Sequence, residues 1–212
     1  MTTDEKQIGL NKVAQEVREF KGLDIAKAAT NAVPGEGDPD AEIFFFGEAP
    51  GFNEDQQGRP FVGQAGKLLE KTLMSELGLT RDRVYITNIV KYRPPDNRDP
   101  LPNEIEACRE WLDRQIEIIS PKIIVTLGRY SMAKFIPDVS ISKVYGQARF
   151  VDFSGQRYIV FPMYHPAAAL RAGAVMQQFI ADFSKLKNLL GGNVAEVAKI
   201  EPKTEPQQPG LF

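Results

Sequence analysis

The sequence has very little of the residue types that build metal centres and covalent cross-links. It contains one cysteine, Cys108, and one histidine, His165, among 212 residues. A single cysteine cannot form an internal disulfide, and one thiolate cannot hold a metal cluster without ligands of another type. The chain is therefore not a disulfide-stapled domain. Its one imidazole, that of His165, is a candidate functional group.

Long hydrophobic runs and a strong net charge are also lacking. No apolar run approaches the roughly 20 residues that span a bilayer, and the segment MTTDEKQIGL lacks the basic and apolar regions of a signal peptide. We therefore expect a cytoplasmic protein without a membrane segment. The formal net charge is -2, so binding to nucleic acid would depend on a local basic patch.

The composition predicts one domain followed by a tail. With 42% hydrophobic and 25% charged residues, a chain of this length buries a single core. We expect residues 1–190 to form that domain and to act as a monomer. Residues 191–212 begin with Gly-Gly and are then rich in Pro, Lys, Glu and Gln, a composition typical of a flexible tail.

Short apolar strands alternate with amphipathic helices along the domain. Helical periodicity covers 4–30, with Ile8, Val13 and Val17 roughly a turn apart. Further helices are predicted at 66–79, 102–119, 130–135 and 177–190, and strands are predicted at 42–46, 84–90 and 122–128, with a hairpin between 144 and 164. This order predicts an α/β fold whose mostly parallel sheet is covered on both faces.

The stretch GEAPGFNEDQQGRPFVGQAG, residues 47–66, follows the apolar strand EIFFF. It is rich in glycine, amides and charged side chains. In an α/β sheet, ligands bind where loops leave the carboxyl ends of the strands. We therefore expect this loop to carry the functional site.

Four chemically distinct side chains follow predicted strands. They are Glu48, Phe61, Asn88 and His165. Singly, the first three have ordinary explanations, as a solvated turn residue, a core phenylalanine and a turn former. Together, a carboxylate, an aromatic face, an amide and an imidazole are what a pocket needs to hold a planar heterocycle and cut its bond to a sugar.

The motifs that carry these residues resemble one known family. GEAPG, GRPFVGQAG, TNIVKYRPP and HPAA occur in order and at similar spacing in the bacterial and archaeal family 4 of the uracil-DNA glycosylase superfamily. The resemblance covers about residues 20–190. It implies a three-layer α/β/α sandwich with a central four-stranded, mostly parallel sheet, and removal of uracil from DNA to leave an abasic site.

The resemblance also implies roles for the residues that contact the base. His165 would donate a hydrogen bond to uracil O2 as negative charge develops there. Asn88 would accept from N3–H and donate to O4, an arrangement that cytosine cannot satisfy. Phe61 would stack on the ring.

Three further positions complete the implied pocket. Glu48 would orient or polarise the attacking water, and the backbone of Ala49 would contact the base. Ala49 also stands where better-known uracil glycosylases have an aspartate base, so general-base catalysis should be weaker here or come from Glu48. Glu54 is a candidate for blocking the methyl group of thymine.

The sequence departs from the family at its iron–sulfur cysteines. The four-cysteine pattern of family 4 corresponds here to Phe20, Leu23, Tyr92 and Cys108, of which only the last is cysteine. We therefore expect no cofactor and no metal, with apolar packing in the vacated volume. The loop after the second strand also lacks the histidine of the relative that traps uracil covalently, which predicts ordinary turnover.

Two groups of residues are predicted to contact DNA. Leu170 would act as an apolar wedge and Arg171 would reach a phosphate or a groove, as such loops do in the superfamily. Lys91, Arg93 and Arg98 form a second basic cluster. The alternative for this cluster is an ordinary solvated loop.

Three other functions compete with uracil excision. A relative with the same fold could act on hypoxanthine, xanthine or a mismatched base. A lesion-binding protein without catalysis would not need Glu48, Asn88 and His165 together. A nucleoside hydrolase would not need the basic loop or the Leu170-Arg171 segment.

The end of the chain carries a short linear pattern. Gln208, Leu211 and Phe212 stand at the spacing of the peptides by which bacterial repair and replication proteins dock on the sliding clamp. A chance occurrence of two apolar residues in an unstructured end is the alternative.

Overall fold

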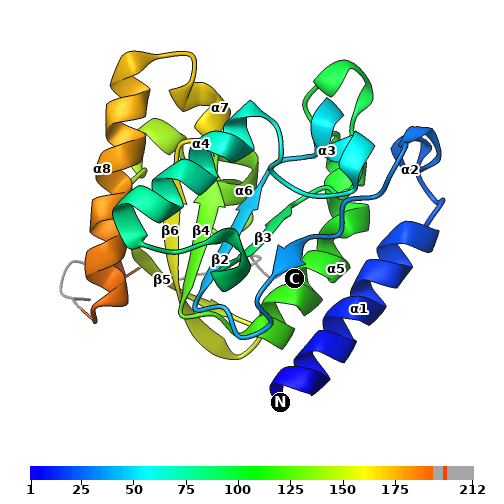
Figure 1. The fold of residues 1–212 in the computed structure, drawn as a ribbon, viewed down its shortest axis with the longest axis horizontal. Helices are drawn as coiled ribbons and strands as arrows, with labels where there is room; N and C mark the ends of the chain where they lie inside the picture. Colours follow the sequence, from blue (N-terminus) through cyan, green and yellow to red (C-terminus); the bar gives the residue numbers. More distant parts are fainter. Residues whose placement is uncertain (193–197, 200–212) are drawn as a thin grey trace, which may run out of the picture.

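The computed structural model describes residues 1–192 and 198–199. Within these residues the strands form one seven-stranded sheet in the order β1-β3-β2-β4-β6-β5-β7 (Figure 1). The strands are β1 (Glu36–Gly37), β2 (Ile43–Gly47), β3 (Tyr85–Asn88), β4 (Ile123–Leu127), β5 (Arg149–Phe153), β6 (Gln156–Met163) and β7 (Ala198–Lys199). The predicted strands and the predicted hairpin are confirmed.

The predicted four-stranded sheet is confirmed as the parallel centre of a larger one. β3, β2, β4 and β6 pair in parallel. β1 and β5 extend this centre with antiparallel strands, and β7 pairs in parallel with β5. Ala198–Lys199, within the predicted tail, pairs with β5, whereas 193–197 and 200–212 lie outside the described residues.

Helices cover both faces of the sheet, as predicted. They are α1 (Thr3–Glu19), α2 (Asp24–Ala28), α3 (Phe52–Gln57), α4 (Gln64–Thr72), α5 (Pro102–Ile119), α6 (Arg129–Ala133), α7 (Pro166–Ala169) and α8 (Gly173–Leu190). A π-helical turn at Leu73–Leu77 continues α4, and short 3-10 turns occur at Arg81–Arg83, Pro95–Asn97 and Ile141–Lys143. Figure 1 shows α1 and α5 on one side of the sheet and α8 on the other.

The apolar run of β2 explains the three layers. Successive strand side chains point to opposite faces of a sheet. Phe44 and Phe46 pack in one core with residues of α1 and α5, whereas Ile43 and Phe45 pack in a second core with residues of α4 and α8. All five residues of β2 are buried, so this central strand must be apolar on both faces.

Local signals set the ends of the long helices. The side chain of Thr2 accepts from the Glu5 amide and Glu5 accepts from the Thr2 amide, a capping box that begins α1. Pro102 occupies the first turn of α5, where its missing N–H leaves no bond unmade. One predicted core position was wrong: Ile8 is 68% exposed, and Leu10 is buried in its place.

The parallel strands all point toward one edge of the sheet. β2 ends at Gly47, β3 at Asn88 and β6 at Met163, so the residues that follow them meet at the upper edge in Figure 1, beside α3 and α7. This edge is where an α/β sheet binds its ligands. No helix in the described part of the chain is long and apolar enough to cross a membrane.

Candidate active site

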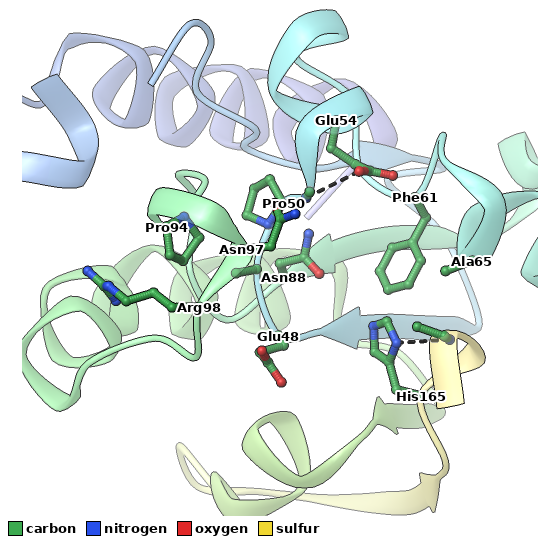
Figure 2. A pocket seen from close by; sticks show the side chains of 13 residues that line it. Glu48, Pro50, Glu54, Phe61, Ala65, Asn88, Pro94, Asn97, Arg98 and His165 are labelled. Atoms are coloured by element: carbon green, nitrogen blue, oxygen red, sulfur yellow. Dashed lines mark hydrogen bonds between the residues drawn. The ribbon is translucent and has the colours of Figure 1, made fainter. Parts of the chain in front are cut away.

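A cavity lies at this carboxyl edge and collects the residues that the sequence singled out. Its volume is ≈ 220 Å³, equal to about seven waters at roughly 30 Å³ each, which suits one small heterocycle. It is lined by Glu48, Ala49, Pro50, Gly51, Glu54, Phe61, Ala65, Asn88, Pro94, Asn97, Arg98, His165 and Ala167. Figure 2 shows Asn88, Phe61 and His165 converging on one space.

Separate segments bring these side chains together. Glu48 follows β2, Asn88 is the last residue of β3, and His165 is the N-cap of α7 just after β6. Phe61 comes from the turn between α3 and α4. Asn97, in the loop after β3, also lines the cavity but was missed by sequence reasoning; its only signal was the Asp-Asn pair, a turn-forming sequence.

Asn88 forms the floor of the cavity. Its side chain is 2% exposed, and its Oδ1 is buried without a hydrogen-bond partner in the described part of the chain. A buried acceptor without a donor carries a free-energy penalty of about 1–3 kcal/mol. The atom is therefore ready to accept a hydrogen bond from an N–H group of a ligand.

Gly47 allows Asn88 and Phe61 to lie beside each other. A Cβ atom at this position would stand 2.6 Å from Phe61 Cζ and 2.8 Å from Asn88 Oδ1. Both distances are too short for a real side chain. The lack of a side chain at Gly47, in the GEAPG motif, is therefore needed for the shape of the cavity floor.

His165 lies beside Phe61 and presents one N–H group. The two ring centroids are 5.6 Å apart, at an interplanar angle of 32°. Burial, the largest cause, lowers the pKa of His165 to about 4, so its ring is neutral near pH 7. Its Nδ1 accepts from the Ala167 amide at 3.1 Å, which leaves the proton on Nε2.

Glu48 is half-buried, and although its carbonyl accepts from the Val90 amide at 3.0 Å, its carboxylate makes no hydrogen bond or ion pair with the described part of the chain. Burial, helped by the negative charge of Asp99, raises the pKa of its carboxyl group, while Arg129 acts in the opposite direction. Asp99 and Arg129 form an ion pair. The carboxylate of Glu48 is thus free to bind water at the cavity.

Glu54 holds the turn that presents Phe61. Its carboxylate accepts from the amides of Val62 at 2.8 Å, Gly63 at 2.7 Å and Gly51 at 3.2 Å. Phe61 has a φ of 51°, a left-handed conformation that is rare for a bulky residue. These three bonds stabilise that turn, so Glu54 acts on the shape of the cavity wall as well as lining it.

Lys91 does not contact DNA, and the prediction that it would do so was wrong. The side chain is 0% exposed. Its ammonium group donates to Thr87 Oγ1 at 2.7 Å, the Asn88 carbonyl at 2.9 Å and Gln115 Oε1 at 2.8 Å. All three of its N–H bonds are used inside the protein.

The other predicted DNA contacts lie at or near the surface. Leu170 is 48% exposed just after α7, and Arg171 beside it is exposed and makes no ion pair in the described part of the chain. Arg93 also lacks a carboxylate partner there, whereas Arg98 binds Glu104 through two hydrogen bonds of 2.9 and 2.6 Å. Arg93 and Arg171 are thus the cations left available to an anionic ligand.

The positions that correspond to iron–sulfur ligands pack as an apolar group. We call Phe20, Leu23, Tyr92, Cys108 and Trp111 the aromatic cluster; they share one core. Phe20 lies 6.2 Å from Tyr92 and 5.1 Å from Trp111, between ring centroids. The predicted filling of this volume is confirmed.

These residues do not fit an iron–sulfur centre. One cysteine, a buried phenol and two apolar side chains offer a single thiolate. Within 1–192 and 198–199, no three His, Cys, Asp or Glu side chains are grouped to hold a metal ion.

Comparisons with known proteins agree with the geometry. A sequence model described as the Uracil DNA glycosylase superfamily matches residues 34–186. The Type-4 uracil-DNA glycosylase of Sulfurisphaera tokodaii is 52% identical over 85% of this chain and 84% of its own length. The Type-4 uracil-DNA glycosylases of Saccharolobus solfataricus (49% identical, 85% of this chain, 86% of the relative) and Archaeoglobus fulgidus (45%, 86% and 94%) are also similar.

Proposed function

The chain belongs to the uracil-DNA glycosylase superfamily, and from this premise we propose that it removes uracil from DNA. It takes the uracil nucleotide out of the base stack, hydrolyses its N-glycosidic bond and leaves an abasic site for repair. One observation carries this proposal: Asn88 Oδ1, buried without a donor in the described part of the chain, lies in the same small cavity as the neutral imidazole of His165, a hydrogen-bond donor.

His165 stabilises the leaving group. Breaking the glycosidic bond places positive charge on the sugar and negative charge on the base, chiefly at its oxygens. The Nε2–H of a neutral His165 donates to uracil O2 as that charge grows. Removing one such donor typically slows the chemical step by about 10²–10³-fold, or roughly 2.7–4 kcal/mol of barrier.

Asn88 selects uracil over cytosine. Its Oδ1 accepts from N3–H and its amide N–H donates to O4; cytosine has an acceptor and a donor at these positions. The wrong base leaves both groups buried and unpaired, which supports discrimination by about 10⁴ or more. Oδ1 has no hydrogen-bond partner among the residues that the structure describes, which supports this role.

The remaining pocket residues position the base and the water. Phe61 stacks on the ring, and the Ala49 backbone contacts the base edge. Glu48, whose carboxylate has no partner in the described part of the chain, orients or polarises the attacking water. Glu54, fixed by three amides, restricts space where the methyl group of thymine would lie.

DNA is held around the cavity mouth. Leu170 enters the gap that the flipped nucleotide leaves, and Arg171, Arg93 and Arg98 face the phosphates. Arg98 contributes least, since Glu104 already neutralises it. We propose that the protein works as a monomer in the cytoplasm, where its substrate DNA is found.

The test measures abasic-site formation on oligonucleotides that carry U, T, hypoxanthine or xanthine. We expect cleavage at U only. Asn88→Asp and His165→Ala should each lower the single-turnover rate by at least about 10²-fold, with little change in product binding. Asn188→Asp, the same exchange at an exposed position of α8, is the control. Release of hypoxanthine or xanthine instead of uracil would assign the protein a different base specificity within the superfamily.

We also propose that residues Gln208, Leu211 and Phe212 tether the enzyme to a sliding clamp. These residues lie outside the described part of the chain, so the proposal rests on the sequence pattern alone. A peptide of residues 201–212 should bind the clamp of the same organism, and replacing Leu211 and Phe212 with Ala should abolish binding. Equal binding by both peptides would leave only a chance motif.

A further inference from the structure

An exposed aromatic residue stands at the rim of the cavity. Phe52 is the first residue of α3 and is 55% exposed. Its neighbour Gly51 lines the cavity, as does Glu54 one turn further along the helix. Figure 1 shows α3 beside the loop that follows β3 and apart from α7. Because about half of the Phe52 side chain is exposed to solvent, the ring does not contribute to the hydrophobic core.

Arg93 covers part of that ring and is itself held in place. Its guanidinium carbon lies 5.2 Å from the Phe52 ring centroid. Its Nε donates to Asn97 Oδ1 at 2.8 Å, and Asn97 lines the cavity. The terminal nitrogens of Arg93 have no hydrogen-bond or ion-pair partner in the described part of the chain. Phe52, Arg93 and Asn97 therefore form a continuous rim from the surface to the cavity.

The other cations near the cavity lack this combination. Arg98 is paired with Glu104 and Arg129 is paired with Asp99, so neither has its charge free. Arg171, like Arg93, makes no ion pair in the described part of the chain, but the exposed apolar side chain beside it is Leu170, which has no π-face. Among the described residues near the cavity, an unpaired guanidinium lies over an exposed ring only at Arg93 and Phe52.

We propose that Phe52 and Arg93 form a binding subsite for the nucleotide next to the excised uracil. The base of that nucleotide stacks on the open part of the Phe52 ring, and its phosphate pairs with the terminal nitrogens of Arg93. Proteins that bind single strands combine these two elements, an aromatic platform and a cation for the backbone. The subsite rests on the proposed function, because it adjoins the cavity assigned to uracil.

The subsite requires an unpaired base. A base that is paired and stacked inside a duplex cannot reach the face of Phe52. Stacking on an aromatic side chain contributes about 1–3 kcal/mol per base. The subsite therefore favours uracil in single-stranded or frayed DNA over uracil in an intact duplex.

The first experiment compares single-stranded and duplex DNA of one sequence with uracil at its centre. Phe52→Ala should raise the KM for the single strand by roughly 5- to 150-fold, leave kcat unchanged, and alter the duplex KM far less. Phe52→Trp should retain single-strand binding, whereas Phe52→Leu, which keeps apolar area but has no π-face, should lose most of it. Met74→Ala, at another half-exposed apolar position, is the control and should change neither substrate.

The second experiment removes the partner base instead of the ring. Replacing the nucleotide on the 5′ or the 3′ side of uracil with an abasic analogue should weaken wild-type binding as much as Phe52→Ala does. In the Phe52→Ala protein the same replacement on that side should have little further effect. Such coupling on one side also tells which neighbour is bound.

The third experiment tests the phosphate contact by salt dependence. Arg93→Gln should reduce the slope of log Kd against log salt for the single strand by about 0.7, the value for one phosphate contact. Arg98→Gln, which removes an already paired cation, should change that slope less.

Two results would overturn the subsite: equal effects of Phe52→Ala on single strand and duplex, or wild-type binding that is indifferent to both abasic neighbours. Failure of the proposed function looks different, since the wild-type protein would then release no uracil from either substrate. Kd values, measured by anisotropy of labelled DNA, test the subsite even in that case.

Discussion

Lys91 and Tyr92 are adjacent and both buried, but their surroundings differ. Lys91 lies among polar groups, whereas Tyr92 lies among apolar side chains. Lys91 joins Thr87, Gln115 and the Asn88 carbonyl in what we call the polar network. Tyr92 belongs to the aromatic cluster. The polar network holds the backbone of Asn88, which we propose reads the base, whereas the aromatic cluster secures the segment after α1. The polar network thus fixes the geometry of the candidate site, and the aromatic cluster stabilises the fold.

The two regions also differ in how they respond to pH. Burial, the largest cause, lowers the pKa of Lys91 to about 7, with Cys108 raising it and Lys134 lowering it. The three acceptors around its ammonium group favour the charged form, because a neutral amine has only two N–H bonds. Titration of Lys91 therefore acts on the polar network, while the interior beside Tyr92 is held mainly by apolar contacts.

The largest expected effect on stability comes from emptying the aromatic cluster. Tyr92→Ala should lower the free energy of unfolding by about 3–5 kcal/mol, the range for removing a large buried ring. Urea unfolding measures this change. The single-turnover rate of uracil release per folded molecule should stay near the wild-type value. A large loss of that rate at full folding would show that the cluster also shapes the site.

The second prediction concerns the polar network and follows from the lowered pKa of Lys91. Below pH 7, folded and unfolded chains both carry the charge, so the full burial penalty is present. Between pH 7 and 10.5 the folded chain has released the proton and the unfolded chain has not, so stability rises with pH.

Urea unfolding at pH 7 and pH 9 checks this prediction. The free energy of unfolding of the wild type should increase relative to that of Lys91→Met by about 1 kcal/mol per pH unit. Parallel pH profiles for the two proteins would mean that Lys91 is not the titrating group.

A smaller effect separates the hydroxyl of Tyr92 from its ring. The hydroxyl donates to the Val17 carbonyl at 2.6 Å. Tyr92→Phe keeps the ring but leaves that carbonyl without its donor, so it should lower the free energy of unfolding by about 1 kcal/mol. The difference from Tyr92→Ala then measures the ring. Equal losses for both variants would assign the stabilisation to the hydrogen bond.

The smallest expected effect is none. If the aromatic cluster replaces an iron–sulfur centre, purified protein should contain no stoichiometric iron and no visible absorbance band. Incubation with a strong chelator should leave the melting temperature unchanged. A brown protein, or a melting temperature that falls with chelation, would mean that a metal centre exists despite the single thiolate.

Much of the fold could be predicted because the signals were local. The run at 42–46 is apolar on both faces, which is typical of a central parallel strand, and Pro102 marks the start of α5. The two-residue strands β1 and β7 could not be found, since two residues show no periodicity. Glu48, Asn88 and His165 could be placed together because the ends of parallel strands share one edge, and Phe61 reaches that edge through the turn between α3 and α4.

Lys91 shows where sequence reasoning failed. Lys91 begins the stretch KYRPP, whose arginine and two prolines are typical of a solvated loop. Its burial depends on Thr87, four residues back, and on Gln115, which lies in α5. Acceptors supplied by a distant helix leave no trace in the local pattern. The exposure of Phe52 likewise could not be predicted, because it depends on how α3 packs against the rest of the fold.

The order of the strands has a consequence for the protein during its synthesis. The cavity needs β2, β3 and β6, and His165 follows the last of these. At roughly 5–20 residues per second, several seconds of translation separate Asn88 from His165. A nascent or truncated chain that ends before β6 therefore lacks both a strand of the central sheet and the hydrogen-bond donor that we propose for His165. We expect such a chain to release uracil far more slowly than the complete protein, so DNA near the ribosome should meet this activity mainly from molecules whose sheet is complete.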